Sequence, residues 1–126
     1  MTTYQNFING KWAKSKSGKS VSNINPGNTD DVIGDTPLAT REEAREAVEA
    51  AANAFQSWRS TPAPTRGRIV GKAARLFEEH KEELAQLLTP EEGKTIAEAR
   101  GELQRSINVA EFCAGEARRL NGETIQ

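Results

Sequence analysis

The side chains suited to nucleophilic catalysis are one cysteine and one histidine, Cys113 and His80. A cysteine acts as a nucleophile when a base or a cation beside it favours the thiolate. His80 falls at an apolar position of one predicted helix, and Cys113 stands between Phe112 and Ala114 on another. No sequence feature orients the two toward each other, so both are predicted to be buried packing residues. They are also too few for a zinc site.

Phosphate chemistry is suggested by Gly93-Lys94-Thr95, which looks like the end of a phosphate-binding loop. Such a loop needs a glycine five residues before Gly93, because its backbone amides wrap the phosphates. Leu88 occupies that position, which excludes the loop. The G-x-G-x-x-G fingerprint of dinucleotide sites is also absent from the sequence. The motifs therefore predict no catalytic residue and no cofactor-binding residue in this chain.

The charge and hydropathy of the chain exclude nucleic acid and a membrane as partners. The chain has 17 basic and 18 acidic residues, without a basic stripe interleaved with aromatics, so nucleic acid is excluded. Its longest apolar run is only a few residues, too short to span a membrane, and the N-terminus does not read as a signal peptide. A single cysteine cannot form an internal disulfide, which fits a reducing compartment. The cytoplasm is the expected location.

Residues 1–39 are predicted to form short strands and turns. Tyr4 to Trp12 predicts a hairpin, because the Asn9-Gly10 pair tolerates the positive φ angles of a type I′ turn. A polar loop is expected over residues 15–20. Extended segments are expected at 21–24 and around 32–38, separated by the turn sequence Asn25-Pro26-Gly27-Asn28.

Residues 40–122 are predicted to form three amphipathic helices. Thr40-x-x-Glu43 is a capping box that opens the first helix. This helix has one apolar face, which extends as far as Trp58 and is predicted to be buried. The second runs from about Thr65 to Leu88, and its Gly67-x-x-x-Gly71 spacing indicates close approach of a neighbouring helix. Thr89-Pro90-Glu91-Glu92 is interpreted as a helix cap with proline at the first helical position.

The third helix is predicted from about Thr95 to Leu120, after a break at Gly93. Asn121-Gly122 is typical of a C-terminal cap, and Thr124-Ile125 reads as the start of a strand. The apolar face of this helix is predicted at positions that recur every three or four residues: Ile96, Ala99, Leu103, Ile107, Ala110, Ala114 and Ala117.

The order and spacing of several short motifs resemble the N-terminal part of an aldehyde dehydrogenase, over nearly the whole chain. Within that family, the sequence is similar to bacterial semialdehyde dehydrogenases, including those that act on succinic or 2-oxoglutaric semialdehyde. The motifs that carry the resemblance are Phe7-Ile-Asn-Gly-Lys-Trp12, Asn25-Pro26-Gly27, Trp58, Thr65-Arg66-Gly67-Arg68-Ile69, Glu92-Gly93-Lys94, Glu98-Ala99-Arg100-Gly101-Glu102, Phe112, Ala114, Gly115 and Gly122-Glu123-Thr124-Ile125.

The resemblance implies oxidation of an aldehyde to a carboxylic acid with NAD or NADP. In that family a cysteine thiolate attacks the carbonyl, an asparagine and a backbone amide hold the oxyanion, and a glutamate activates water. Family members are several times longer, and these residues come later in their chains. Cys113 does not match the catalytic cysteine. NAD or NADP thus belongs to the complete family enzyme, and neither is expected to bind this chain alone.

Only peripheral roles carry over from the resemblance. Gly101 and Arg105 match positions that border the substrate tunnel, where Arg105 would attract a substrate carboxylate; an ordinary solvated arginine is the alternative. In some relatives a monovalent cation is held by the backbone at the position of Ile24 and by a carboxylate at that of Glu91. Pro90 departs from the residue usual in the family.

The resulting fold expectation is an α+β fragment, in which an N-terminal β-hairpin layer precedes three amphipathic helices, with residues 1–126 as one N-terminal segment. In the complete fold these helices pack against a parallel sheet that this sequence lacks. Their apolar faces should therefore bind the remainder of the fold or drive self-association.

Two functions remain open at this stage. The first is the N-terminal portion of an NAD(P)-dependent semialdehyde dehydrogenase, inactive alone. The alternative is a non-catalytic helical module, derived from that family and used for oligomerisation or interaction. An independent enzyme would need a nucleophile and a cofactor site that the sequence does not reveal.

Overall fold

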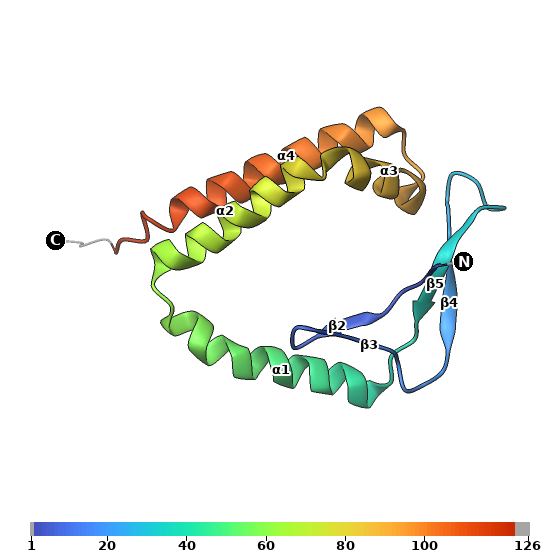
Figure 1. Ribbon diagram of the computed structural model, residues 1–126, viewed down its shortest axis with the longest axis horizontal. Helices are drawn as coiled ribbons and strands as arrows, with labels where there is room; N and C mark the ends of the chain where they lie inside the picture. Colours follow the sequence, from blue (N-terminus) through green and yellow to red (C-terminus); the bar gives the residue numbers. More distant parts are fainter. Residues whose placement is uncertain (1, 123–126) are drawn as a thin grey trace. The chain divides into compact units, whose positions relative to one another are not determined.

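A computed structural model describes residues 2–122 of the chain (Figure 1). The chain divides into two compact units. Unit 1 is Met1–Ser60 with Pro90–Gly93, and unit 2 is Thr61–Thr89 with Lys94–Gln126. Over the described range, every helix is too short or too polar to cross a membrane. The strand expected at Thr124-Ile125 lies outside the described residues.

Unit 1 begins with the predicted hairpin. Strands β2 (Asn6–Ile8) and β3 (Lys11–Ala13) pair antiparallel, and Phe7 lies opposite Trp12 with the ring centroids 4.9 Å apart. The turn between the strands has φ angles of 50° at Asn9 and 74° at Gly10. Two successive positive φ angles are the signature of a type I′ turn, so the hairpin prediction is confirmed.

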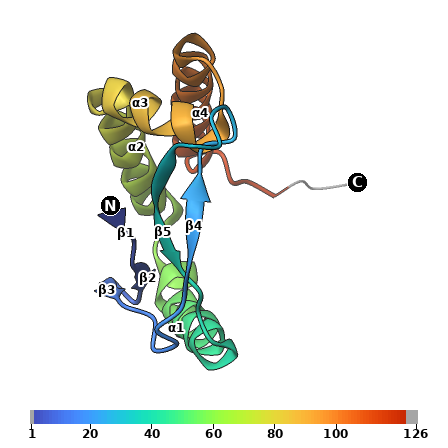
Figure 2. The same cartoon turned by 90° about the vertical axis from the view of Figure 1, so that its right-hand side faces the viewer.

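A three-stranded sheet completes the β-structure of unit 1, in the order β1-β5-β4 (Figure 2). Strands β4 (Ser20–Ile24) and β5 (Val32–Pro37) are antiparallel and occupy the predicted segments. The predicted turn between them is held by the amide of Gly27, which donates to Asn25 Oδ1 at 2.8 Å. Strand β1 (Thr2–Thr3) joins β5 in parallel and was not predicted, because two residues carry no periodic signal.

Helix α1 (Arg41–Ser60) follows β5, and the predicted capping box at its start is formed. The amide of Glu43 donates to Thr40 Oγ1 at 3.1 Å, and the amide of Thr40 donates to Glu43 Oε2 at 2.8 Å. The apolar face predicted for burial is uncovered within unit 1, because Val48, Phe55 and Trp58 are 68%, 54% and 40% exposed. The hairpin and small residues of this helix line one cavity, to which α1 contributes Ala47, Ala50, Ala51 and Ala54.

Unit 2 consists of three helices: α2 (Ala63–Glu79), α3 (Lys81–Glu92) and α4 (Ile96–Glu116). The last residues of α3 are counted with unit 1. Helices α2 and α4 lie side by side and run antiparallel (Figure 1). The buried apolar residues are mainly small, which lets the helices approach closely: Ala74, Ala85, Ala99 and Ile107.

The predicted fold class is confirmed, with four helices in place of three over residues 2–122. The second predicted helix is divided at His80, which caps the end of α2 with φ −103° and ψ 14°. The cap predicted at Thr89-Pro90 is wrong, because both residues continue α3 and Pro90 lies in its last turn. Pro90 has no backbone N–H, so α3 lacks the hydrogen bond that this residue would otherwise donate to the carbonyl four residues earlier.

Helix α4 starts where predicted but ends at Glu116, four residues early. The amides of Arg118 and Arg119 donate to carbonyls three residues back, so the regular i to i−4 pattern has stopped. The apolar face of α4 is confirmed along its whole length, because each of its seven predicted positions is buried or half-buried.

The predicted close approach at the glycine pair of α2 is also confirmed. A Cβ built on Gly67 would lie 2.6 Å from Ala117 Cβ and 2.7 Å from the Ala114 oxygen. At this contact, α2 meets α4 through small residues. The larger apolar side chains of α2, among them Ile69 and Leu76, are 52% and 46% exposed.

Candidate functional site

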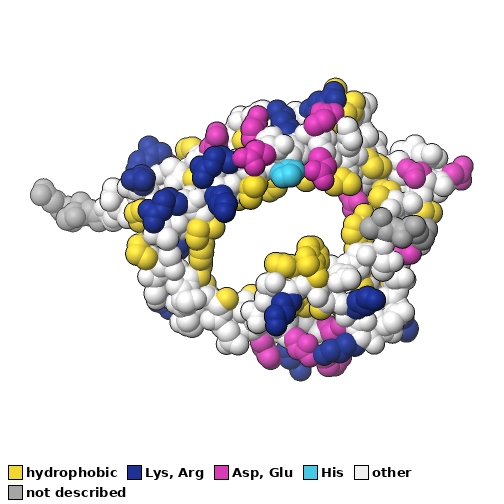
Figure 3. Space-filling model, in the orientation of Figure 1, with side chains coloured by type: hydrophobic (Ala, Val, Ile, Leu, Met, Phe, Trp, Pro, Cys, Tyr) yellow, Lys and Arg dark blue, Asp and Glu magenta, His cyan; other side chains and the backbone are white. Residues whose placement is uncertain are grey.

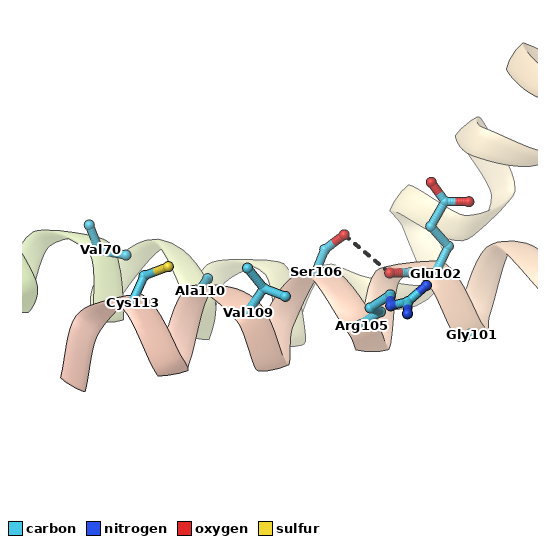
Figure 4. A pocket seen from close by; sticks show the side chains of 8 residues that line it. All are labelled: Val70, Gly101, Glu102, Arg105, Ser106, Val109, Ala110 and Cys113. Atoms are coloured by element: carbon cyan, nitrogen blue, oxygen red, sulfur yellow. Dashed lines mark hydrogen bonds between the residues drawn. The ribbon is translucent and has the colours of Figure 1, made fainter. Parts of the chain in front are cut away.

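A groove of about 920 Å³ runs along α4 and contains both residues predicted to border a substrate tunnel, Gly101 and Arg105 (Figure 4). Residues four apart on a helix share a face, which is why these two reach the same groove. The remaining lining residues come from α4 and, in one case, α2: Val70, Glu102, Ser106, Val109, Ala110 and Cys113. The groove therefore combines an apolar surface with a small polar group at one end.

The polar end of the groove offers one guanidinium for binding an anion. Ser106 Oγ donates to the backbone oxygen of Glu102 at 3.1 Å, and the Glu102 carboxylate forms an ion pair with Lys94. Arg105 is exposed and has no carboxylate partner in residues 2–122. An unpaired guanidinium can hold a carboxylate through two parallel hydrogen bonds. This is the chemistry expected of Arg105, and its role in substrate binding stays a prediction.

Cys113 lines the same groove, which the sequence did not predict. The prediction that Cys113 and His80 are buried is wrong: the thiol is exposed, and the His80 side chain is 57% exposed. His80 Nδ1 lies 3.0 Å from Glu83 Oε2, so its recorded partner is a surface glutamate. Cys113 follows Arg105 by eight residues, about 12 Å along the helix axis, too far for contact. The groove thus lacks an activated nucleophile.

The two residues predicted to hold a monovalent cation belong to unit 1. Asn23 Nδ2 donates to Glu91 Oε2 at 2.8 Å, and Asn23 precedes Ile24 on β4 where the pairing with β5 shifts register. Glu91 therefore reaches the strand that carries Ile24. A carboxylate with backbone carbonyls is the oxygen-rich ligand set that hard cations take. The cation site stays a prediction, and no cluster of three His, Cys, Asp or Glu side chains occurs across the described range.

Unit 1 also contains a buried carboxylate, that of Glu43, which is 6% exposed. Hydrogen bonds from the backbone amides of Thr40 and Lys16, with a further one from the Ser15 hydroxyl, lower the pKa of Glu43 to about 2. Hydrogen bonds that favour the charged form are the cause of such a shift. The group is structural, because every recorded partner joins the start of α1 to its own loop or to the preceding one.

Two more carboxylates stabilise unit 2. Arg100 donates to Glu82 from Nε at 2.9 Å and from Nη2 at 2.6 Å, and this forked contact between α4 and α3 lowers the pKa of Glu82. The Thr95 amide lowers the pKa of Glu98 in the capping box that opens α4. Both are exposed pairs with structural roles, and neither faces the groove.

The connection from β5 to α1 does not fit a dinucleotide. Such cofactors place their diphosphate at a helix N-terminus after a glycine-rich turn from a strand. Within residues 2–122 the connection from a strand to a helix is β5 to α1, whose loop, 38–40, contains no glycine. The Glu43 carboxylate already accepts from the amide at the start of α1, and its negative charge would repel a phosphate there.

Sequence profiles and curated relatives agree on the family. The profile of the Aldehyde dehydrogenase family matches residues 12–126. The chain is 46% identical to malonate-semialdehyde dehydrogenase 2 of Geobacillus kaustophilus over 123 residues, which cover 98% of this chain and 25% of that protein. It is 42% identical to the alpha-ketoglutaric semialdehyde dehydrogenase of Bacillus subtilis, with the same shares covered.

Solved structures give the same result. The NADP-dependent glyceraldehyde-3-phosphate dehydrogenase of Bacillus halodurans matches with a TM-score of 0.93 and 31% identity, over 100% of this chain and 26% of that one. The betaine aldehyde dehydrogenase of Staphylococcus aureus, in complex with NAD+, matches with a TM-score of 0.89 and 37% identity. The match covers 98% of this chain and 25% of that one. The chain thus spans about a quarter of the length of the relatives it matches.

Proposed function

The chain belongs to the aldehyde dehydrogenase family, and on this premise we propose that it forms the N-terminal portion of an NAD(P)-dependent dehydrogenase. The complete enzyme would oxidise an aldehyde, specifically a semialdehyde acid, to a carboxylate. Residues 1–126 would act as one N-terminal segment that carries the strands and helices around the catalytic part. A cytoplasmic location belongs to the same proposal.

The observation that carries the proposal is the exposure of apolar helix faces in a chain that covers a quarter of its relatives. Val48 on α1 and Phe112 on α4 are 68% and 64% exposed. Apolar area left in water costs on the order of 25 cal/mol per Å², so these faces favour a covering partner. The remainder of the aldehyde dehydrogenase fold is the partner we propose.

A buried donor in unit 2 supports the same proposal. Arg66 Nε is buried and finds no hydrogen-bond partner among residues 2–122. A buried donor without an acceptor is costly, roughly 1–3 kcal/mol. An acceptor from the remainder of the fold would satisfy it.

We propose that the chain alone is inactive. Among the described residues that line the groove, none next to Cys113 is a base, and the connection from β5 to α1 does not fit a dinucleotide. The nucleophile, the oxyanion donors and the site for NAD or NADP would be supplied by the remainder of the fold. What this chain contributes is binding and orientation, and the monovalent cation at Ile24 and Glu91 would serve that structural purpose.

Substrate binding would use the groove on α4. The relatives named above act on semialdehydes of malonate and of α-ketoglutarate, which carry a carboxylate besides the aldehyde. Arg105 would hold that carboxylate by charge-assisted hydrogen bonds, and Gly101, with no side chain on the same face, would leave room for it.

The test is complementation with the C-terminal three quarters of the Geobacillus kaustophilus relative, expressed separately. Native mass spectrometry should show a one-to-one complex, and the mixture should form NADH or NADPH when malonate semialdehyde is added. The isolated 126-residue chain should form neither NADH nor NADPH. Reduction of NAD by the chain alone would overturn the proposed inactivity.

The competing function is the non-catalytic interaction module, which the uncovered face of α1 also favours. A module of this kind would form a homo-oligomer of fixed size that ignores the added C-terminal portion. The same mass spectra distinguish the two, because mixed complexes and pure homo-oligomers differ in mass.

A further inference from the structure

We propose that unit 2 holds an anion site, separate from the groove of Arg105, that binds the phosphate group of a small molecule. The site is a cavity of about 370 Å³ between residues 64–75 of α2 and residues 114–118 at the end of α4. It shares no lining residue with the other groove. Its lining consists of three arginines on a floor of small residues: Arg68, Arg75, Arg118, Pro64, Gly67, Gly71 and Ala114.

The charged residues that line this cavity all have one sign, because they are Arg68, Arg75 and Arg118. Residues 61–77, at the start of unit 2, include four basic residues and no aspartate or glutamate: Arg66, Arg68, Lys72 and Arg75. Figure 3 shows basic side chains gathered over the start of α2 and the end of α4. A concave surface lined by one sign of charge concentrates the field and attracts counter-ions. The attracted ligand is therefore an anion.

The arginines of the cavity are available for such a ligand. Arg68 Nη2 donates to Thr65 Oγ1 at 2.9 Å, which holds this side chain along α2. Neither Arg75 nor Arg118 pairs with a carboxylate in the described part of the chain. Three guanidinium groups around one cavity repel one another until an anion neutralises them. Phosphate fits best, because its oxygens match the forked donors of arginine.

The floor of the cavity explains why the ligand is a phosphate ester. Arg75 Nη1 lies 4.0 Å from the position that a Cβ on Gly71 would take, so this guanidinium lies over a bare glycine. Pockets for small molecules typically measure about 300–1,000 Å³, which is larger than one phosphate needs. The uncharged floor, with Gly67 and Ala114, would contact the organic part of the ester.

Nucleic acid does not fit the same cavity. Single strands bind through bases stacked on aromatic side chains, in addition to charge. None of the lining residues is aromatic. The cavity therefore suits one compact phosphate ester and not a polymer.

The experiment is isothermal titration calorimetry of the 126-residue chain with inorganic phosphate and with phenyl phosphate, at ionic strength fixed by NaCl. Both anions should bind one site per chain, and phenyl phosphate should bind more tightly than phosphate because of its apolar part. Equal affinity of the two anions would identify free phosphate as the ligand and overturn the ester. Absence of saturable binding would overturn the site.

Matched variants locate the site. Arg75→Gln and Arg118→Gln should each weaken phosphate binding about tenfold, the effect of losing one charge-assisted hydrogen bond. Arg45→Gln, an exposed arginine of α1, removes the same charge elsewhere and should leave the affinity unchanged. Equal weakening by all three would show diffuse charge attraction and overturn the site.

Two further measurements guard against a trivial loss of fold. Helix content by circular dichroism should match the wild type in each variant. Arg118→Lys keeps the charge but loses the forked donors, so it should weaken binding less than Arg118→Gln. Unchanged affinity in every Arg118 variant would remove that residue from the site. The outcome is independent of the proposed dehydrogenase function, which requires no anion at this cavity.

Discussion

The backbone amide of Lys16 donates to the buried carboxylate of Glu43 at 2.7 Å, across 27 residues of sequence. The same carboxylate accepts from the Thr40 amide at 2.8 Å and from the Ser15 hydroxyl at 2.9 Å. One side chain thus caps α1 and fixes the polar loop before β4 to the start of that helix. Its charge state controls both contacts.

Unit 1 should lose stability in acid because of Glu43. The Thr40 and Lys16 amides hold the pKa of Glu43 near 2 in the folded chain, against an ordinary value of 4.5. A lowered folded pKa contributes stability that is complete above pH 4.5 and is lost as the pH falls toward 2. Denaturant midpoints measured across this range should fall for the wild type and change much less for Glu43→Gln.

The control for this prediction is Glu42→Gln, which removes the same charge from the exposed neighbour. It should retain the acid-dependent fall of the wild type. An identical pH dependence in wild type and Glu43→Gln would show that Glu43 does not control acid stability.

The contact of α2 with α4 predicts opposite effects at two glycines of one helix. Gly67→Ala should lower the free energy of unfolding by about 1–3 kcal/mol, because the new Cβ meets a backbone oxygen that cannot move cheaply. Gly71→Ala should raise it by up to about 1 kcal/mol, since its Cβ would lie 3.6 Å from Ala114 Cβ and alanine favours helix. Urea denaturation followed by circular dichroism measures both; similar effects at the two positions would refute the close contact.

Gly93 should be the least replaceable of the glycines with positive φ. An alanine at φ 68° costs about 1–2 kcal/mol in backbone strain, and its Cβ would lie only 2.6 Å from the Gly27 nitrogen. Gly18→Ala is the matched control, with φ 66° and open space around the new Cβ. Thermal unfolding should show a larger fall in Tm for Gly93→Ala than for Gly18→Ala. An equal fall in Tm for the two variants would mean that backbone strain alone acts.

Arg105→Gln should change substrate preference in the complemented enzyme. The variant loses a charge-assisted hydrogen bond to the substrate carboxylate, so KM for malonate semialdehyde should rise about tenfold or more. KM for propanal, which lacks the carboxylate, should stay the same. Initial rates with both substrates measure the difference, and a parallel rise for both would make Arg105 an ordinary surface residue.

Local signals in the sequence were sufficient for most elements of this fold. The Asn9-Gly10 turn, the Thr40–Glu43 box and the seven-residue apolar face of α4 each depend on residues a few positions apart. Conformational preference and helix periodicity act over that range. The same signals failed at His80 and Pro90, where the chain continued or stopped a helix against its local preference.

Only the tertiary structure decided which surfaces meet. It placed small residues between α2 and α4 and left Ile69 and Leu76 exposed, because packing rewards the closest approach of two helices. It brought Val70 of α2 to the groove of Arg105, and it brought Arg118 to the arginines of α2 from more than 40 residues away. The sequence by itself determined the family and the local elements; contacts between residues far apart in the chain depend on how helices pack, which no short motif encodes.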